Sequence, residues 1–274
     1  MSTIETERRG NVARIWLNRP KQHNAQNEEM IYALDAAFAE ATADDDVRVI
    51  VLAGRGRSFS SGHDLSRTVG GTSEADIAEL RKTTEGRLHH ERTSYFDKCL
   101  AIRNCPKPTI AQVHGHCIAA GLMLACMCDL IIAGESAKFS NPVVRMGAIG
   151  VEVFVEPWEV GVRKAKEMLF LGDVLTAEDA RHLGLANRVY PDEDLEREVD
   201  HLAERISKLP PMAAQLTKES FNATLQTMGQ LASWHSHFMI HQVGHATDEY
   251  QQIISPANTG DLKAFLERRD AAAH

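Results

Sequence analysis

The segment 106–134, PKPTIAQVHGHCIAAGLMLACMCDLIIAG, constrains the fold of this 274-residue chain more than any other stretch. Apolar and β-branched residues at 109–115 follow two prolines and predict a strand. A helix is expected to begin near Ala119, and residues 129–134 again have the composition of a strand. Strands that alternate with loops and helices predict an α/β core built from strand–loop–helix units.

Other segments on both sides extend this pattern. Residues 12–18, 47–54 and 185–190 are rich in β-branched and apolar residues, and we expect strands there. Asn27 is a candidate N-cap for a helix whose apolar residues recur at helical spacing. A loop rich in glycine and serine, GRGRSFSSGHDL, covers residues 54–65.

Helical signals fill most of the remaining chain. Residues 74–104 are expected to be mostly helical, with an interruption at Gly86. The TAED sequence that begins at Thr176 is a capping-box pattern, and Gly184 suits the end of the helix that it starts. Further helices are expected at 192–208, 211–226, 229–251 and 260–269. We therefore divide the chain into an α/β core, 1–195, and a C-terminal helical region, 196–274.

The overall charge limits the kinds of partner that the chain can bind. Thirty basic and 38 acidic residues give a formal net charge of −8 and a pI near 5.9, which argues against nucleic acid and anionic membranes. The N-terminal segment lacks the apolar core of a signal peptide, and the most apolar run, 117–133, is broken by Asp129. We expect a cytoplasmic protein without a membrane segment. The five cysteines, an odd number, then indicate free thiols.

The histidines and cysteines of 114–134 raise the question of a metal site. Cys126 and Cys128 are two residues apart on a presumed helix, so they do not share a face. His114 and His116 do share a face of a strand, yet no CxxC pair or HExxH motif accompanies them. We therefore expect no metal site, and we expect these cysteines to behave as small apolar residues.

The small residues Ala119, Ala120 and Gly121 favour a different chemistry, that of the backbone. The first N–H groups of a helix have no partner within it and carry partial positive charge, so they can bind an oxygen that becomes anionic. Small residues would equally suit close packing of the helix. The loop SFSSGHDL, 58–65, supplies a second glycine-containing turn after a strand, and two such turns can direct two amides at one oxygen.

Taken together, these segments resemble the enoyl-CoA hydratase/isomerase family, also called the crotonase superfamily. The resemblance covers most of the chain and rests on NRPKQHNAQN (18–27), VIVLAGRGRSFSSGHDL (49–65), the segment 106–142, TAEDARHLGLANRVYP (176–191) and AFLERR (264–269). It implies a crotonase-like α/β spiral of ββα units with a C-terminal helical trimerisation region, and a homotrimer or hexamer. It also implies an acyl-CoA substrate, with coenzyme A as part of the substrate and no further cofactor.

By motif position, the resemblance assigns an oxyanion hole to the backbone N–H groups of His63 and Ala120. These donors would hold the thioester oxygen as the acyl group becomes an enolate, and the loss of one such donor typically costs about 3–4 kcal/mol of transition-state stabilisation. Both residues depart from the alanine and glycine that are commoner in the family. The implied substrate and coenzyme A contacts are Lys21, His23, Ala25, Ser61, Gly62, His63, Asp64, Leu65 and Ala120.

The two glutamates of typical hydratases are missing from this sequence. Met123 and Val143 stand at the matching positions, and neither side chain can carry a proton. Glu152 lies in a loop where other members of the superfamily place a carboxylate, and its apolar neighbours are expected to raise its pKa and suit it to proton transfer. Alternatively, Glu152 caps a helix or meets a basic residue at a subunit contact. Glu156 is the next candidate.

Other titratable residues are assigned structural roles. Asp64 is expected to stabilise its own loop or a helix start. His89, His90 and Glu91 lie in the region that shapes the acyl pocket in relatives, where a histidine can transfer protons near neutral pH. We expect these three residues to lie on a solvated helix face instead.

Three classes of function follow from these observations. The first class is an acyl-CoA enzyme of fatty-acid metabolism, and we expect it to be classed as an enoyl-CoA hydratase, which is a lyase. The alternative within this class is an enoyl- or dienoyl-CoA isomerase, or another crotonase-type reaction that uses Glu152. A non-catalytic acyl-CoA binding protein is the second class, because both usual glutamates are absent. RNA binding, as in one relative with a lysine-rich first helix, is disfavoured because the helix here carries Glu28, Glu29, Asp35 and Glu40.

Overall fold

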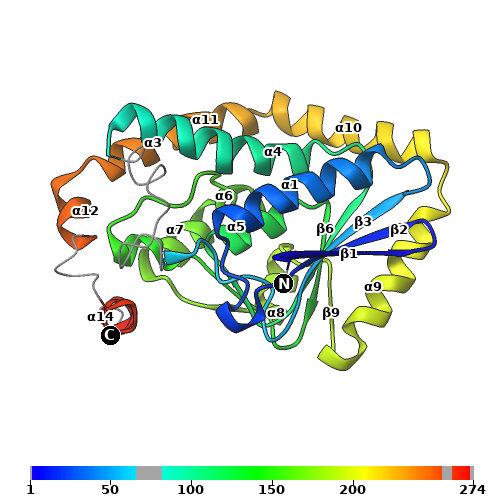
Figure 1. Cartoon of the computed structure of the whole chain (residues 1–274), viewed down its shortest axis with the longest axis horizontal. Coiled ribbons are helices and arrows are strands. Elements are labelled where there is room, and N and C mark those ends of the chain that lie inside the picture. The colour runs from blue at the N-terminus through cyan, green and yellow to red at the C-terminus, as the bar shows by residue number, and fades with distance from the viewer. Residues whose placement is uncertain (1, 66–81, 255–260, 272–274) are drawn as a thin grey trace.

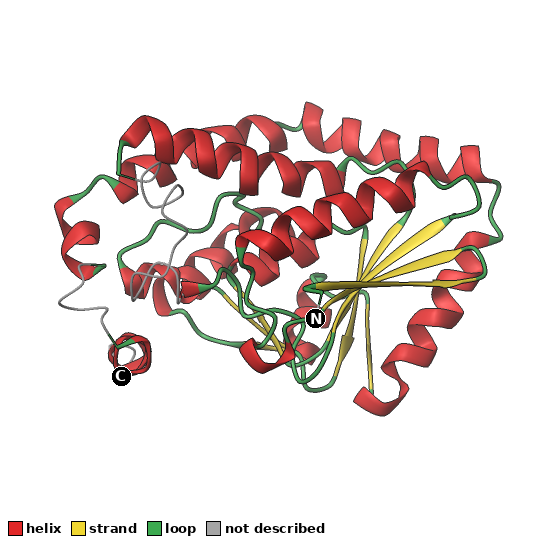
Figure 2. Cartoon of the chain, viewed as in Figure 1, coloured by secondary structure: helices red, strands yellow, loops and turns green. Residues whose placement is uncertain are grey.

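A six-stranded sheet forms the centre of the molecule (Figures 1 and 2). The computed structural model describes residues 2–65, 82–254 and 261–271. In spatial order the strands are β1 (Ile4–Arg9), β2 (Val12–Leu17), β3 (Val49–Gly54), β4 (Thr109–Val113), β6 (Leu130–Gly134) and β9 (Arg188–Tyr190). β1 runs antiparallel to β2, and the other pairs are parallel. The strands predicted from the sequence are confirmed with shorter bounds, and β1 was not predicted.

Helices cover this sheet and extend beyond it. The longer ones are α1 (Glu28–Ala43), α3 (Thr84–Glu91), α7 (Val162–Leu171), α9 (Asp192–Ser207), α10 (Pro211–Thr227), α11 (Gln230–His245) and α14 (Leu262–Ala271). The shorter ones are α4 (Asp97–Arg103), α5 (Ala120–Cys126), α6 (Glu156–Glu159), α8 (Ala177–Leu183) and α12 (Asp248–Ile253), with η1 (Pro20–Gln22), the π-turn η3 (Arg92–Phe96) and η4 (Pro142–Met146).

Packing on both faces explains why β3 is apolar throughout. Ile50 and Leu52 belong to the core cluster on the side of α1 and α5, whereas Val49 and Val51 pack with residues of α9. Successive side chains of a strand point to opposite faces, so a strand that is covered on both sides needs apolar residues at every position.

A second sheet consists of three short strands. β5 (His116–Ile118) pairs parallel with β7 (Lys138–Ser140), and β7 pairs antiparallel with β8 (Leu175–Thr176). The chain thus passes from β4 to β5 to α5, and later from β6 to β7 to the helices that follow. These ββα units form the spiral that the resemblance implied.

Helix ends agree with the sequence signals at three positions. The Asn27 side chain accepts a hydrogen bond from Met30 N at 3.1 Å and caps α1. Thr176 and Asp179 form the predicted capping box at the start of α8, and Gly184 ends that helix with a left-handed φ of 86°. Capping therefore sets the boundaries of the helices that the sequence located best.

Other helix predictions need correction. Gly86 lies in the first turn of α3, where its N–H donates to the Thr83 side chain, and does not interrupt a helix. The single helix expected at 229–251 is two helices, α11 and α12, because Thr247 caps a new helix after the break. The expected helical residues 74–81 lie outside the described residues.

The C-terminal helices leave apolar side chains exposed. These side chains include Met212, Leu216 and Phe221 on α10 and Met239, Ile240 and Val243 on α11. α9 crosses the expected boundary at residue 195 and packs on the sheet, and the division into 1–195 and 196–274 stays a prediction. Within the described ranges, no helix has both the length and the hydropathy to cross a bilayer.

Candidate active site

Two loops meet above the carboxyl ends of β3 and β4. The loop after β3 runs beside β5, because Ser60 N donates to His116 O at 2.9 Å and Ile118 N donates to Ser60 O at 3.0 Å. The Gln26 side chain joins both loops: its Nε2 donates to Ser60 Oγ and to Ala120 O, each at 3.1 Å. The loop 58–65 and the start of α5 are thereby fixed to one another.

Two glycines permit this close approach. A β-carbon on Gly62 would lie 2.8 Å from Ile118 O and 3.3 Å from Ala120 N, and Gly62 has a φ of 92°. A β-carbon on Gly121 would lie 2.4 Å from Ser60 O. Any side chain at either position would therefore push the loops apart.

The N–H groups of His63 and Ala120 are both left without an acceptor among the described residues. Ala120 is the first residue of α5 and is completely buried. Buried N–H groups without a partner are rare, and each requires an explanation such as a ligand or water. Because Gly62 lies against the Ala120 nitrogen, the two unpaired donors lie in the same small region.

The Glu152 carboxylate lies against the side chain of His63. His63 Nε2 and Glu152 Oε2 are 3.0 Å apart, and the side chains of His63 and Glu152 are 23% and 4% exposed. Burial alone would raise the pKa of Glu152, but the charge and the hydrogen bond of His63 outweigh it and place this pKa below its usual value. The expectation that apolar neighbours raise the pKa of Glu152 was therefore wrong.

A buried polar network continues beyond His63. The Tyr95 ring lies 4.4 Å from the His63 ring, and Tyr95 Oη donates to Glu28 Oε1 at 2.9 Å. His90 Nε2 lies 3.1 Å from the same Glu28 oxygen. The expectation of a solvated face was wrong for His90 and Glu91, which are buried, whereas His89 is exposed. Sequence reasoning also missed Glu28 and Tyr95 as neighbours of His63.

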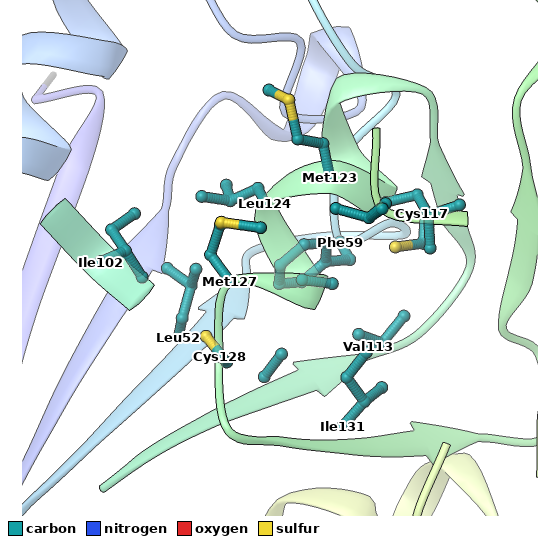
Figure 3. Close-up of a cluster of buried hydrophobic side chains, with 14 of the residues drawn as sticks. Leu52, Phe59, Ile102, Val113, Cys117, Met123, Leu124, Met127, Cys128 and Ile131 are labelled. Atoms are coloured by element: carbon teal, nitrogen blue, oxygen red, sulfur yellow. The ribbon is translucent and has the colours of Figure 1, made fainter. Parts of the chain in front are cut away.

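The two positions of the usual hydratase glutamates are apolar and buried. Met123 belongs to the large core cluster, and Figure 3 shows it on α5, with its side chain pointing away from the other labelled side chains. Val143 is also in this cluster. A cavity of about 30 Å³ is lined by His63, Met123 and Tyr95 together with apolar residues of α1 and α4. The cavity wall is thus apolar at Met123, whereas Val143 does not line this cavity.

The second candidate carboxylate, Glu156, lies in a different environment. Its Oε1 accepts a hydrogen bond from Asn141 Nδ2 at 2.5 Å, and its Oε2 has no partner among the described residues. Burial raises the pKa of Glu156, and this hydrogen bond only partly offsets the effect. The pKa of Glu156 is thus shifted upward, in the opposite direction to that of Glu152.

The expected coenzyme A contacts surround the first loop. Lys21 is exposed on η1, and Ser61 N donates to His23 O at 3.0 Å. His23 Nε2 lies 3.4 Å from Arg57 Nη2, which places two basic side chains together. Ala25 and Leu65 lie on the same two loop segments, and both are half-buried.

Asp64 has the structural role that the sequence predicted. Its carboxylate accepts a hydrogen bond from Arg19 Nη1 at 2.7 Å, which joins the loop 58–65 to the segment before α1. Arg55, on the same loop, pairs with Glu5 at 2.9 Å and stacks on Trp16.

The five cysteines are free thiols, as expected. Burial raises the pKa of Cys117 and Cys126 well above the usual thiol value, and that of Cys128 to about 12. Protonated thiols are poor metal ligands. Among the described residues, the histidines and cysteines of 114–134 form no cluster with metal-binding geometry.

Comparison with known proteins now adds to this geometry. The family model described as enoyl-CoA hydratase/isomerase matches residues 7–273. The chain therefore belongs to the enoyl-CoA hydratase/isomerase family.

Individual relatives agree with this assignment. A Mycobacterium tuberculosis protein named "Putative enoyl-CoA hydratase EchA13" is 44% identical over 253 residues, which cover 88% of this chain and 80% of that protein. The crystal structure of an enoyl-CoA hydratase/isomerase from Xanthobacter autotrophicus Py2 superposes with a TM-score of 0.85 at 34% identity and covers 99% of this chain and 98% of its own. An enoyl-CoA hydratase from Mycobacterium smegmatis superposes with a TM-score of 0.87 at 28% identity, with 98% and 94% covered. The crotonase fold is thus confirmed.

Proposed function

We propose that this protein isomerises an enoyl-CoA by moving a proton between carbon atoms of the acyl group through an enolate. The single observation that carries the proposal is the arrangement at His63: an unpaired backbone N–H next to that of Ala120, and a side chain bonded to the buried Glu152. Family membership supports an acyl-CoA substrate.

The backbone donors stabilise the charge that develops during the reaction. Removal of a proton from C2 of a 3-enoyl-CoA leaves an electron pair that spreads over the acyl chain onto the thioester oxygen. The N–H groups of His63 and Ala120 donate to this oxygen, and because they are held by the fold they do not have to reorganise. Return of the proton at C4 places the double bond between C2 and C3. No proton or electron is lost in this sequence.

The His63–Glu152 pair carries the proton. The low pKa of Glu152 keeps the carboxylate ionised at neutral pH, so it can accept a proton and hold the imidazole of His63 in place. His63 Nδ1 is buried and has no partner in the described part of the chain, which leaves it free to exchange a proton with the substrate. One carboxylate suffices for isomerisation, since it takes up and returns the same proton.

Hydration of a 2-enoyl-CoA is the second candidate, and the names of the relatives favour it. The same donors would stabilise the enolate, but water must also be activated. Met123 and Val143 replace the two carboxylates that hydratases use for this step, so the structure favours isomerisation.

Assembly and location belong to the same proposal. Exposed apolar side chains on α10 and α11 suit a homotrimer or a dimer of trimers. Lys21, His23 and Arg57 suit the phosphates of coenzyme A, and we keep the expectations of no separate cofactor and of a cytoplasmic location.

Ultraviolet absorbance of the conjugated enoyl thioester tests the reaction. We expect the purified protein to convert a 3-enoyl-CoA into the conjugated 2-enoyl-CoA, which raises the absorbance. Glu152→Gln and His63→Ala should each lower kcat by about 10²–10⁴-fold, because general acid–base catalysis contributes this much and both variants keep the backbone N–H groups. Glu178→Gln removes an exposed carboxylate on α8 and should leave kcat unchanged.

Two results would overturn the proposal. Loss of crotonyl-CoA absorbance without conversion of the 3-enoyl-CoA would identify a hydratase. Acyl-CoA binding without turnover of either compound would identify a non-catalytic binding protein.

A further inference from the structure

A cluster of three metal-ligand side chains lies where α3 packs against α11, beside the proposed proton carrier. His241 and His245 are four residues apart on α11 and therefore share a face of that helix. Glu91 is the last residue of α3, far away in sequence. Figure 1 shows these two helices side by side. Two imidazoles and one carboxylate form a common ligand set for first-row transition metals.

The spacing of the three ligand atoms suits a tetrahedral ion. The two Nε2 atoms are 2.9 Å apart, and Glu91 Oε2 lies 3.4 Å from His241 Nε2 and 3.6 Å from His245 Nε2. Zinc binds nitrogen and oxygen at about 2.0–2.2 Å, so two ligands of a tetrahedral zinc ion are about 3.3 Å apart. The three observed distances lie around this value.

A second shell of hydrogen bonds orients two of the three ligands. His241 Nδ1 lies 3.0 Å from Ile149 O. Because a carbonyl oxygen only accepts hydrogen bonds, Nδ1 carries the proton of the neutral ring. His241 Nε2 then presents a lone pair. Gln242 Nε2 donates to Glu91 Oε2 at 2.5 Å. Ligating histidines and carboxylates in metal sites are typically held in this way.

The charge balance around the cluster favours a bound cation. Glu91 is buried, and the buried Glu152 lies near enough to interact electrostatically with Glu91 and His241. If both rings are neutral, a single N–H proton is left among the two Nε2 atoms and Glu91 Oε2, which also receives the bond from Gln242. A divalent ion would satisfy all three lone pairs at once and offset the two carboxylates.

A pocket borders the cluster at His245. Its volume is about 540 Å³, and His245 and Gln242 form part of its wall together with Lys82 and Arg87. Arg87 Nη1 donates to His245 O at 3.1 Å, so this guanidinium is held at the backbone of the helix. Basic groups in the wall suit water, hydroxide or a small anion as the fourth ligand of the ion.

We propose that Glu91, His241 and His245 bind one divalent transition-metal ion, for which Zn²⁺ has the matching geometry. The ion joins α3 to α11 and adds positive charge near Glu152, which interacts electrostatically with Glu91 and His241. This site differs from the histidines and cysteines of 114–134, and it departs from the expectation that the protein holds no metal. It is independent of the proposed isomerisation, because metal content rather than turnover reports on it.

Metal analysis of the full-length protein tests the site. After treatment with a chelator, equilibration with ZnCl₂ and gel filtration, we expect about one Zn²⁺ per chain. Glu91→Gln and His245→Asn should each lose most of this zinc, whereas His235→Asn, which changes a histidine of α11 outside the cluster, should retain it. Zinc should also raise the Tm of the wild type and of His235→Asn only, since an ion that binds the folded state stabilises it. Co²⁺ in place of Zn²⁺ should give the visible absorption of a four-coordinate site.

Several results would overturn the metal site. Wild-type protein that holds less than about a tenth of one equivalent after equilibration does not have the site, whatever the variants do. Equal zinc in wild type, Glu91→Gln and His245→Asn would place the ion elsewhere. Loss of zinc in His235→Asn as well would show that zinc binding is not specific to these three ligands. If His245→Asn fails to fold, the wild type and Glu91→Gln still decide the question.

Discussion

Ala119 has a backbone conformation that residues with a β-carbon seldom adopt. Its φ is 51° and its ψ is −115°, and it directly precedes the first residue of α5. Ala119 N donates to Ser140 O, and Ala119 O accepts from Met123 N, so the surrounding structure holds this conformation in place. Strain of this kind typically costs about 1–3 kcal/mol and is common at functional sites. Here it sets the direction of the Ala120 N–H.

Replacement of Ala119 with glycine should therefore stabilise the protein. Relief of strain is partly offset by the larger conformational freedom of glycine in the unfolded chain, about 0.4–1 kcal/mol, so we expect a net gain of about 1 kcal/mol. Urea unfolding measures this change. Ala125→Gly, in the regular part of α5, should destabilise the protein instead. A loss of stability in Ala119→Gly would show that the conformation is not strained.

The backbone half of the candidate site could be predicted from sequence, whereas its side-chain half could not. Gly62 and Gly121 can be recognised in the sequence as positions where two loops approach closely, because such an approach of two backbones excludes a side chain. The contact between His63 and Glu152 joins positions 89 residues apart, and no local pattern reveals such a pair. The direction of the pKa shift of Glu152 was mispredicted for this reason. The neighbours of Glu152 in sequence are apolar, but its hydrogen-bond partner, His63, comes from the loop 58–65.

At the scale of elements, long strands and capped helices were predictable, and short or broken elements were not. β3 is a continuous apolar run, and α8 has both of its end signals. β5, β7 and β8 have two or three residues each, too few to show a period of two. The break between α11 and α12 contains no proline, and its cap, Thr247, is a common residue within helices as well.

The short helix α6 carries two acidic residues, Glu156 and Glu159, on one turn. Burial and the negative charge of Glu156 raise the pKa of Glu159 to about 7, from 4.5. The folded state holds this proton more tightly than the unfolded state. The contribution of Glu159 to the free energy of unfolding is therefore fully present below pH 4.5 and is lost as the pH rises through 7.

Glu159→Gln should remove this part of the pH dependence. A shift of one pKa unit corresponds to 1.36 kcal/mol. Between pH 4.5 and 8, the free energy of unfolding of the wild type should therefore fall by at most about 3 kcal/mol more than that of the variant. Unfolding free energies measured across this range provide the test. Parallel curves for the two proteins would contradict the raised pKa of Glu159.

At the scale of the whole molecule, the neighbouring helices α10 and α11 expose several large apolar side chains. Phe221 is 68% exposed, and Val243 is 66% exposed. Soluble monomers seldom expose several large apolar residues on neighbouring helices, because their burial in an interface is favourable. This surface is consistent with the homotrimer or hexamer that the family resemblance implies.

Phe221→Asp should weaken this self-association. We expect light scattering to give a multiple of three of the 30.3 kDa chain mass for the wild type and a smaller species for the variant, since a charge in an apolar interface is costly. His201→Asp, on the exposed face of α9, should leave the mass unchanged. A monomeric wild type at micromolar concentration would rule out the oligomer.

A crystal structure with a saturated acyl-CoA such as butyryl-CoA would locate the thioester oxygen, because this compound cannot isomerise. We expect the thioester oxygen to lie about 2.7–3.1 Å from both the His63 and Ala120 backbone nitrogens, with the acyl C2 next to the His63–Glu152 pair. A thioester oxygen bound by any other group, while both N–H groups stay unoccupied, would contradict this expectation.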